Sequence, residues 1–89
     1  MYKALVGNYV RSMSIDKLRE YVNKNYKNVS DSEIKVIYKY IKNYWQEIYD
    51  EDRNILNNLK NEVSPSTYRE ILKLLDTAYN FKNRSSREN

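Results

Sequence analysis

The stretch SDSEIKVIYKYIKNYW, residues 30–45, combines a helix start with a helical apolar face. Ser30 and Glu33 have the spacing of a capping box, in which each side chain accepts a hydrogen bond from the backbone amide of the other residue. Apolar residues then recur every three or four positions, at Ile34, Ile37, Tyr38, Ile41 and Trp45. The stretch therefore predicts an amphipathic helix over about residues 31–45.

Similar patterns on both sides of this stretch predict further helices. Three residues are candidate N-caps: Ser14, Asp50 and Ser64, the last followed by Pro65 at the first helical position. The helices that they begin are expected over about residues 15–27, 51–62 and 65–81. Near the N-terminus, helical spacing also links Tyr2, Leu5, Val6, Tyr9, Val10 and Met13. We expect an all-α fold, a compact bundle of four or five short helices.

The composition supports one domain and excludes several kinds of site. A chain of 89 residues, with 40% hydrophobic and 31% charged residues, has room for one folded domain, which we place over residues 1–81. Residues 82–89 contain no apolar anchor and are expected to be a disordered polar tail. The chain has no Cys and no His, so disulfides, thiolate metal sites and histidine acid–base chemistry are excluded. We therefore expect a cytoplasmic protein that is not an enzyme and has no cofactor.

Several short motifs resemble those of a known family. They are Leu18 with Tyr21, Val29-Ser30, Ile34 with Ile41, residues 48–53 with the sequence IYDEDR, residues 63–67 with the sequence VSPST, and Leu74-Leu75. Over residues 9–81 the chain resembles the YqfT-like family of small helical proteins of unknown function from low-GC Gram-positive bacteria. This resemblance implies a helical fold and a bacterial or phage origin. It implies no active-site residues.

Two groups of polar residues have a simpler explanation than catalysis. The acidic residues Glu47, Asp50, Glu51 and Asp52 lack the ligand spacing and the central glycine of a calcium loop, and are typical of a helix N-terminus. The hydroxyl residues Ser64, Ser66 and Thr67 have no histidine to activate them. We therefore interpret both groups as helix starts, and expect no catalytic and no metal-binding residues.

Lysines form one stripe on the predicted helix 31–45. Lys35, Lys39 and Lys42 fall within an arc of roughly 60° on a helical wheel, and Tyr40 lies between this stripe and the apolar face. Such a stripe suits contact with a phosphate backbone, although it lacks side chains that read bases. A solvated face opposite the core is the competing interpretation. The net charge of +4 is also small for a dedicated nucleic-acid binder.

The aromatic residues suggest a protein partner instead. The chain has ten Tyr and one Trp, and these residue types are enriched at protein interfaces. Trp45 falls on the predicted core face, whereas Tyr44 and Tyr49 are candidates for an exposed interface. We expect a small non-enzymatic interaction module, either an adaptor, an assembly protein or a regulator, that binds another protein. A homo-oligomer is also possible, and no membrane contact is expected. The alternative is a nucleic-acid-binding protein of helix-turn-helix type that uses helix 31–45.

Overall fold

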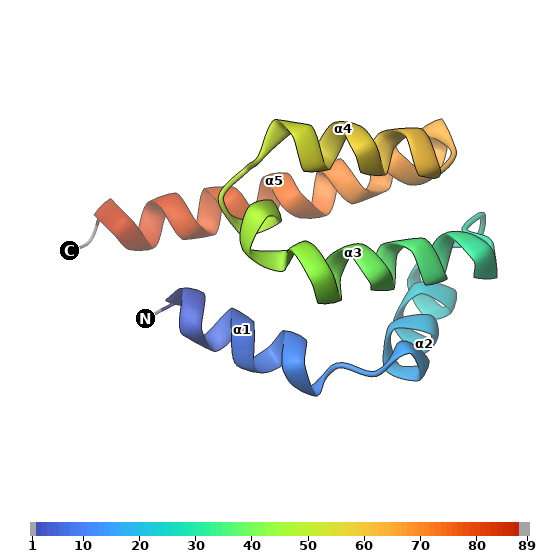
Figure 1. The fold of residues 1–89 in the computed structure, drawn as a ribbon, viewed down its shortest axis with the longest axis horizontal. Coiled ribbons are helices and arrows are strands. Elements are labelled where there is room, and N and C mark those ends of the chain that lie inside the picture. Colours follow the sequence, from blue (N-terminus) through green and yellow to red (C-terminus); the bar gives the residue numbers. More distant parts are fainter. Residues whose placement is uncertain (1, 88–89) are drawn as a thin grey trace.

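A computed structural model describes residues 2–87 of the chain and contains five helices (Figure 1). In chain order they are α1 (Tyr2–Ser12), α2 (Ile15–Asn25), α3 (Asp31–Tyr49), α4 (Arg53–Glu62) and α5 (Pro65–Arg87). No strand occurs in residues 2–87. The predicted all-α bundle is therefore confirmed.

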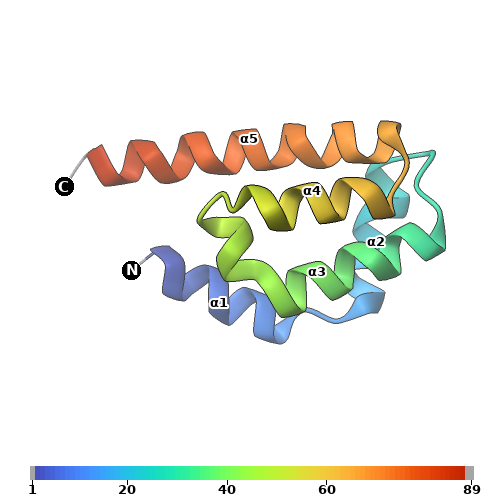
Figure 2. The ribbon, with the colours of Figure 1, turned by 45° about the horizontal axis from the view of Figure 1, so that its top comes forward.

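Helix α3 is the central element of the bundle. It packs against α1, α2 and α4, while α5 packs against α4 as the second arm of an antiparallel hairpin. Figure 2 shows α5 as the outermost layer on one side of the molecule and α1 on the other. The buried apolar side chains come from four helices: Val10, Val22, Ile34, Tyr40 and Leu59. The core thus lies around α3, and no buried apolar residue of this group belongs to α5.

Local signals placed most of the helix starts correctly. The Ser30–Glu33 capping box is formed, with both reciprocal hydrogen bonds, and Ser14 caps α2 by accepting from the amide of Lys17. The predicted cap of α4 is wrong: Asp52, not Asp50, accepts from the amides of Asn54 and Ile55. The reason is that the chain first reverses at Glu51, which has a φ of 61°. The helix therefore begins later than expected.

Two helices run further than the sequence predicts. Helix α3 continues to Tyr49, past a local break at Tyr44, where φ is −132° and ψ is 24°. Helix α5 continues through Arg87, past the predicted end at residue 81, and residues 88–89 of the predicted tail lie outside the described part. No Gly or Pro follows Pro65 to end the helix. Lys82 also anchors it by donating to the carbonyl oxygen of Tyr49 at 2.7 Å.

The contact between α1 and α3 depends on Gly7 and Trp45. A Cβ atom at Gly7 would lie 2.8 Å from Cζ2 of Trp45, so the indole ring occupies the space that any other residue would need. Trp45 is half-buried, in agreement with its predicted position on the core face. Lys42 reinforces this contact, because its ammonium group donates to the carbonyl oxygens of Val10 and Arg11 at 2.7 and 3.2 Å. The end of α1 is thereby capped by α3.

Candidate protein-interaction surface

The lysine stripe of α3 is largely used within the fold. Lys42 caps α1 as described, and Lys35 and Lys39 form ion pairs with Asp31 at 3.6 Å and Glu62 at 3.7 Å. Lys35 and Lys39 keep more than half of their side-chain surface exposed, and ion pairs of this kind contribute little to stability. The stripe therefore offers two exposed lysines, each beside a carboxylate. This arrangement is less favourable for a phosphate backbone than three unpaired lysines.

Tyr40 was expected beside the stripe as a contact residue, and the structure corrects this. Its side chain is 4% exposed, and its hydroxyl donates a hydrogen bond to the carboxylate of Glu62. That hydrogen bond first, and burial second, raise the pKa of Tyr40 to about 12. Tyr40 lies toward α4, where Glu62 accepts its hydrogen bond. A helical wheel of α3 could not show this, because it contains no information on the position of α4. Tyr40 therefore links α3 to α4.

Alkaline titration should reveal this burial. Burial, together with the negative charge of Glu51, also raises the pKa of Tyr79 to about 12. A phenol with a raised pKa in the folded state stabilises the fold below pH 10, its unfolded value, and that contribution is lost as the pH rises toward 12. We expect absorbance at 295 nm to show at least two late-ionising tyrosines, and stability to fall between pH 10 and 12. In Tyr40→Phe, one late-ionising tyrosine should disappear; an unchanged titration would contradict the assignment.

Replacing Lys35, Lys39 and Lys42 together with Gln tests the nucleic-acid alternative. We expect the helical content to be retained and the free energy of unfolding to fall by about 1–2 kcal/mol, because the capping contacts of Lys42 with α1 are weakened. We also expect little or no binding of duplex DNA by either protein at low salt. Strong binding that is lost in the variant, with a salt slope reduced by up to about three, would contradict this. Fluorescence anisotropy at several salt concentrations measures both quantities.

Most of the acidic and hydroxyl groups near the helix starts have structural partners, whereas the buried Oε2 of Glu47 has no hydrogen-bond partner among the described residues. Asp50 pairs with Lys3 at 3.1 Å, Glu51 lies 3.9 Å from Lys82, and Asp52 caps α4. The hydroxyl of Ser64 accepts from the amide of Thr67 at 3.2 Å and caps α5. The helix-start interpretation of Asp52 and Ser64 is thus confirmed, whereas Asp50 and Glu51 connect the α3–α4 turn to α1 and α5.

Glu33 joins the starts of two helices. One carboxylate oxygen accepts from the amide of Ser30 at 3.1 Å, and the other accepts from the amide of Ser64 at 2.7 Å. The first oxygen also accepts from the hydroxyl of Thr67, a residue only 2% exposed, at 3.1 Å. Burial opposes the charge, but the hydrogen bonds from Ser64, Ser30 and Thr67 dominate and lower the pKa of Glu33 to about 2. The carboxylate therefore stays ionised and structural.

The two candidate interface tyrosines have different surroundings. Tyr44 is 39% exposed, and its ring centre lies 5.6 Å from that of Tyr40. Tyr49 is half-buried, with the ammonium groups of Lys3 and Lys82 at 5.4 and 4.7 Å from its ring centre. Tyr44 is therefore available on the surface, whereas Tyr49 is part of the contacts that connect α1, α3 and α5.

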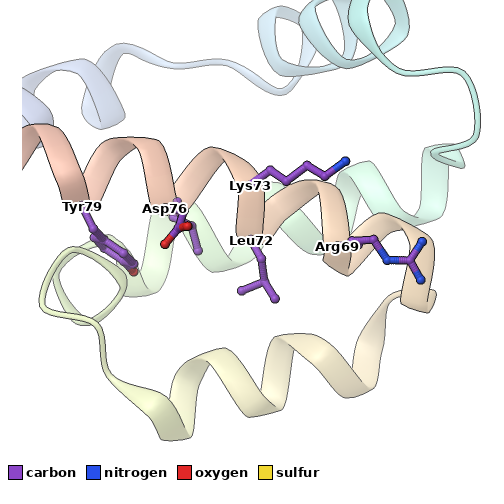
Figure 3. Close-up of a pocket in the computed structure, with 6 residues that line it drawn as sticks. Arg69, Leu72, Lys73, Asp76 and Tyr79 are labelled. Atoms are coloured by element: carbon purple, nitrogen blue, oxygen red, sulfur yellow. The ribbon is translucent and has the colours of Figure 1, made fainter.

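Large apolar side chains are exposed mainly on α1 and α5, which the sequence did not predict. Those on α5 are Leu72, Leu74 and Phe81, and those on α1 are Leu5 and Tyr9. A depression of about 340 Å³ lies on α5, and its lining residues are Arg69, Leu72, Lys73, Leu75, Asp76 and Tyr79 (Figure 3). The apolar residues of α5 span roughly 180° of a helical wheel. A single neighbouring helix covers less than this arc. The width of the apolar arc was therefore the signal in the sequence that part of it is exposed.

Comparison with known families shows a match over most of the chain. A model described as "Protein of unknown function (DUF2624)" matches residues 1–79. The chain belongs to the DUF2624 family. No curated protein matches the chain, and no solved structure matches it. The DUF2624 match covers α1 to α4 and extends along α5 as far as Tyr79, so the depression on α5 lies inside it. Within the described residues, none of the helices is both long and apolar enough to cross a membrane.

Proposed function

We propose that this DUF2624 protein is a non-enzymatic interaction module, an adaptor, assembly protein or regulator, that binds another protein through α5. The observation that carries the proposal is the depression on α5, where Leu72 remains 42% exposed beside Leu75 and Tyr79. Exposed leucine and tyrosine with charged residues at the rim are typical of a protein interface. The basic face of α3 is the weaker candidate, because Lys42 and Tyr40 are used inside the fold.

The chain exposes more surface than a compact monomer of its mass. Its accessible surface is 6586 Å², whereas a compact monomer of 10.8 kDa is expected to expose about 5,500 Å². The excess of about 1,000 Å² belongs to the whole chain, whose extents are 40 × 25 × 22 Å. None of the buried apolar core residues belongs to α5, so the apolar side chains of this helix contribute to the exposed surface.

We also propose a cellular location and a family relationship for this protein. We place the activity in the cytoplasm, because a chain without cysteine needs no oxidising compartment. We also propose that the chain comes from a low-GC Gram-positive bacterium or its phage and is related to the YqfT-like family. The motifs around Asp50–Arg53 and Val63–Thr67 support that relationship.

Capture from a native lysate with matched variants tests the function. The wild-type chain, Leu72→Glu and the control Leu5→Glu should be immobilised separately, since Leu5 is an exposed leucine (65%) on a different helix. Each capture is run at low and high salt, with and without nuclease. We expect a stoichiometric protein that resists nuclease and salt, is lost in Leu72→Glu and is kept in Leu5→Glu. Loss only in Leu5→Glu, or capture of nucleic acid that nuclease abolishes, would contradict the proposal.

A further inference from the structure

Four side chains of α3 form a row that faces α1. They are spaced by four, three and four residues, as on one face of a helix: Tyr38, Lys42, Trp45 and Tyr49. In the middle of the row, Trp45 lies against Gly7, and Lys42 caps the last turn of α1. At one end, Tyr38 donates to the carbonyl oxygen of Met13 at 3.3 Å. At the other end, the ammonium group of Lys3 lies 5.4 Å from the ring centre of Tyr49. Helix α1 therefore runs antiparallel to α3 along the whole row, as Figure 1 shows.

The sequence of α1 gives this helix little stability of its own. It has 11 residues, fewer than the roughly 12–15 that an isolated helix needs in water. Its first turn contains no acidic residue, and Gly7 near its middle lowers its helix propensity. Val10 is buried, whereas Leu5 and Tyr9 are exposed. Helix α1 therefore depends on its contact with α3, and we expect it to lose its helical structure when that contact is broken.

The rest of the bundle has contacts that do not involve α1. Apart from Val10, the buried apolar side chains belong to α2, α3 and α4: Val22, Ile34, Tyr40 and Leu59. The carboxylate of Glu33 joins the starts of α3 and α5. By contrast, the ion pair of α1 between Lys3 and Asp50 joins two exposed side chains, and such pairs contribute little to stability. A segment with few buried apolar contacts opens at a lower free energy than the core of its domain.

We propose that α1 is a latch, which opens as a unit while α2 to α5 stay folded and thereby uncovers the row on α3. Trp and Tyr are enriched among the residues that dominate protein interfaces, so the open state presents an aromatic surface that the closed state covers. Tyr38 and Trp45 change most on opening, because Tyr49 keeps the ammonium group of Lys82 at 4.7 Å from its ring centre. The latch goes beyond the proposed function, since it involves neither Leu72 nor the depression on α5.

Native-state hydrogen exchange of the full chain, followed by NMR at low urea concentrations, tests the latch. We expect the amides of residues 6–12 to share one opening reaction, with protection about 100-fold or more below that of the Tyr40 and Leu59 amides. Opening exposes less surface than unfolding, so its rate of change with urea should be smaller. Exchange of the α1 amides only through global unfolding overturns the proposal. So does protection that falls residue by residue toward the N-terminus without a common urea dependence, since that describes fraying.

Lys42→Met isolates the contact, because it keeps the aliphatic stem and removes the ammonium group that caps α1. We expect the α1 amides to exchange about tenfold faster and the Leu59 amide to be unchanged. The matched control is Lys39→Met, which removes an exposed lysine from the same helix and should change neither rate. Unchanged α1 exchange in Lys42→Met, or equal acceleration in every helix, overturns the latch. Leu72→Glu should leave α1 exchange unchanged, so failure of the latch and failure of the α5 interaction are separate results.

Discussion

Replacing Glu33 with Ala should lower the free energy of unfolding by about 2–4 kcal/mol, the largest loss that we expect from a polar residue of this chain. The carboxylate accepts hydrogen bonds from two backbone amides, those of Ser30 and Ser64, and from the buried hydroxyl of Thr67. Alanine leaves these donors without an acceptor. The starts of α3 and α5 are thereby weakened together.

Glu33→Gln should have a smaller effect, about 1–2 kcal/mol. The amide keeps one oxygen acceptor, but its NH₂ group faces a donor where the second carboxylate oxygen was. Glu20→Ala, at an exposed position on α2, is the matched control and should change stability by no more than about 0.5 kcal/mol. Urea unfolding followed by circular dichroism measures all three values. Equal stability of Glu33→Ala and Glu20→Ala would show that the joined helix starts contribute nothing.

The same carboxylate makes stability depend on acid. Its pKa is about 2 in the folded state against 4.5 for the free group, so the unfolded chain binds the proton more readily. The contribution of Glu33 is therefore complete above pH 4.5 and is lost as the pH falls toward 2. The Arg19 hydrogen bond, which lowers the pKa of Asp31, adds a loss in the same direction. The slope of stability between pH 4.5 and 2 should be shallower in Glu33→Gln than in the wild-type chain.

Local features of the fold were predictable because their causes lie within a few residues. The capping box at Ser30 and the Ser64-Pro65 start depend on side chains that reach only three residues along the chain. Helical periodicity likewise fixed which stretches are amphipathic. The hydrogen bond from the amide of Ser64 to Glu33 was not predictable, since it joins residues 31 positions apart. Thr67, at the place where a capping box would have its own Glu, was the hint that this acceptor comes from elsewhere.

The candidate site could not be read from the sequence for a related reason. A helical wheel shows that Tyr40 lies between two faces, but only the position of α4 shows that Glu62 covers it. The same wheel groups Lys42 with Lys35, although Lys42 turns to the end of α1. For α5, the row of apolar residues at helical spacing was visible in the sequence. The number of helices that cover this row is a property of the whole bundle, so the exposure of Leu72 became known only from the structure.

The second large effect is expected at Gly7. A Cβ atom there would lie 2.8 and 3.0 Å from two atoms of the Trp45 ring, so α1 must move away or the ring must turn. Crowding of this kind costs about 1–3 kcal/mol, and Gly→Ala in a helix returns about 1 kcal/mol through helix propensity. We expect Gly7→Ala to lower stability by about 1 kcal/mol. Gly7→Val adds two methyl groups beyond the Cβ atom of alanine and gains less in helix propensity, so it should lower stability by about 3 kcal/mol.

Fluorescence of Trp45, the single tryptophan of the chain, reports the displacement directly. In Gly7→Val, α1 should detach from α3, and the emission maximum should move to longer wavelength because the half-buried indole becomes exposed to water. The control is Ala4→Val, at an exposed position of the same helix, which should cost only about 0.5 kcal/mol and leave the spectrum unchanged. If Gly7→Val and Ala4→Val have equal stability and identical emission, the close approach of α1 to Trp45 is not what holds this helix on the bundle.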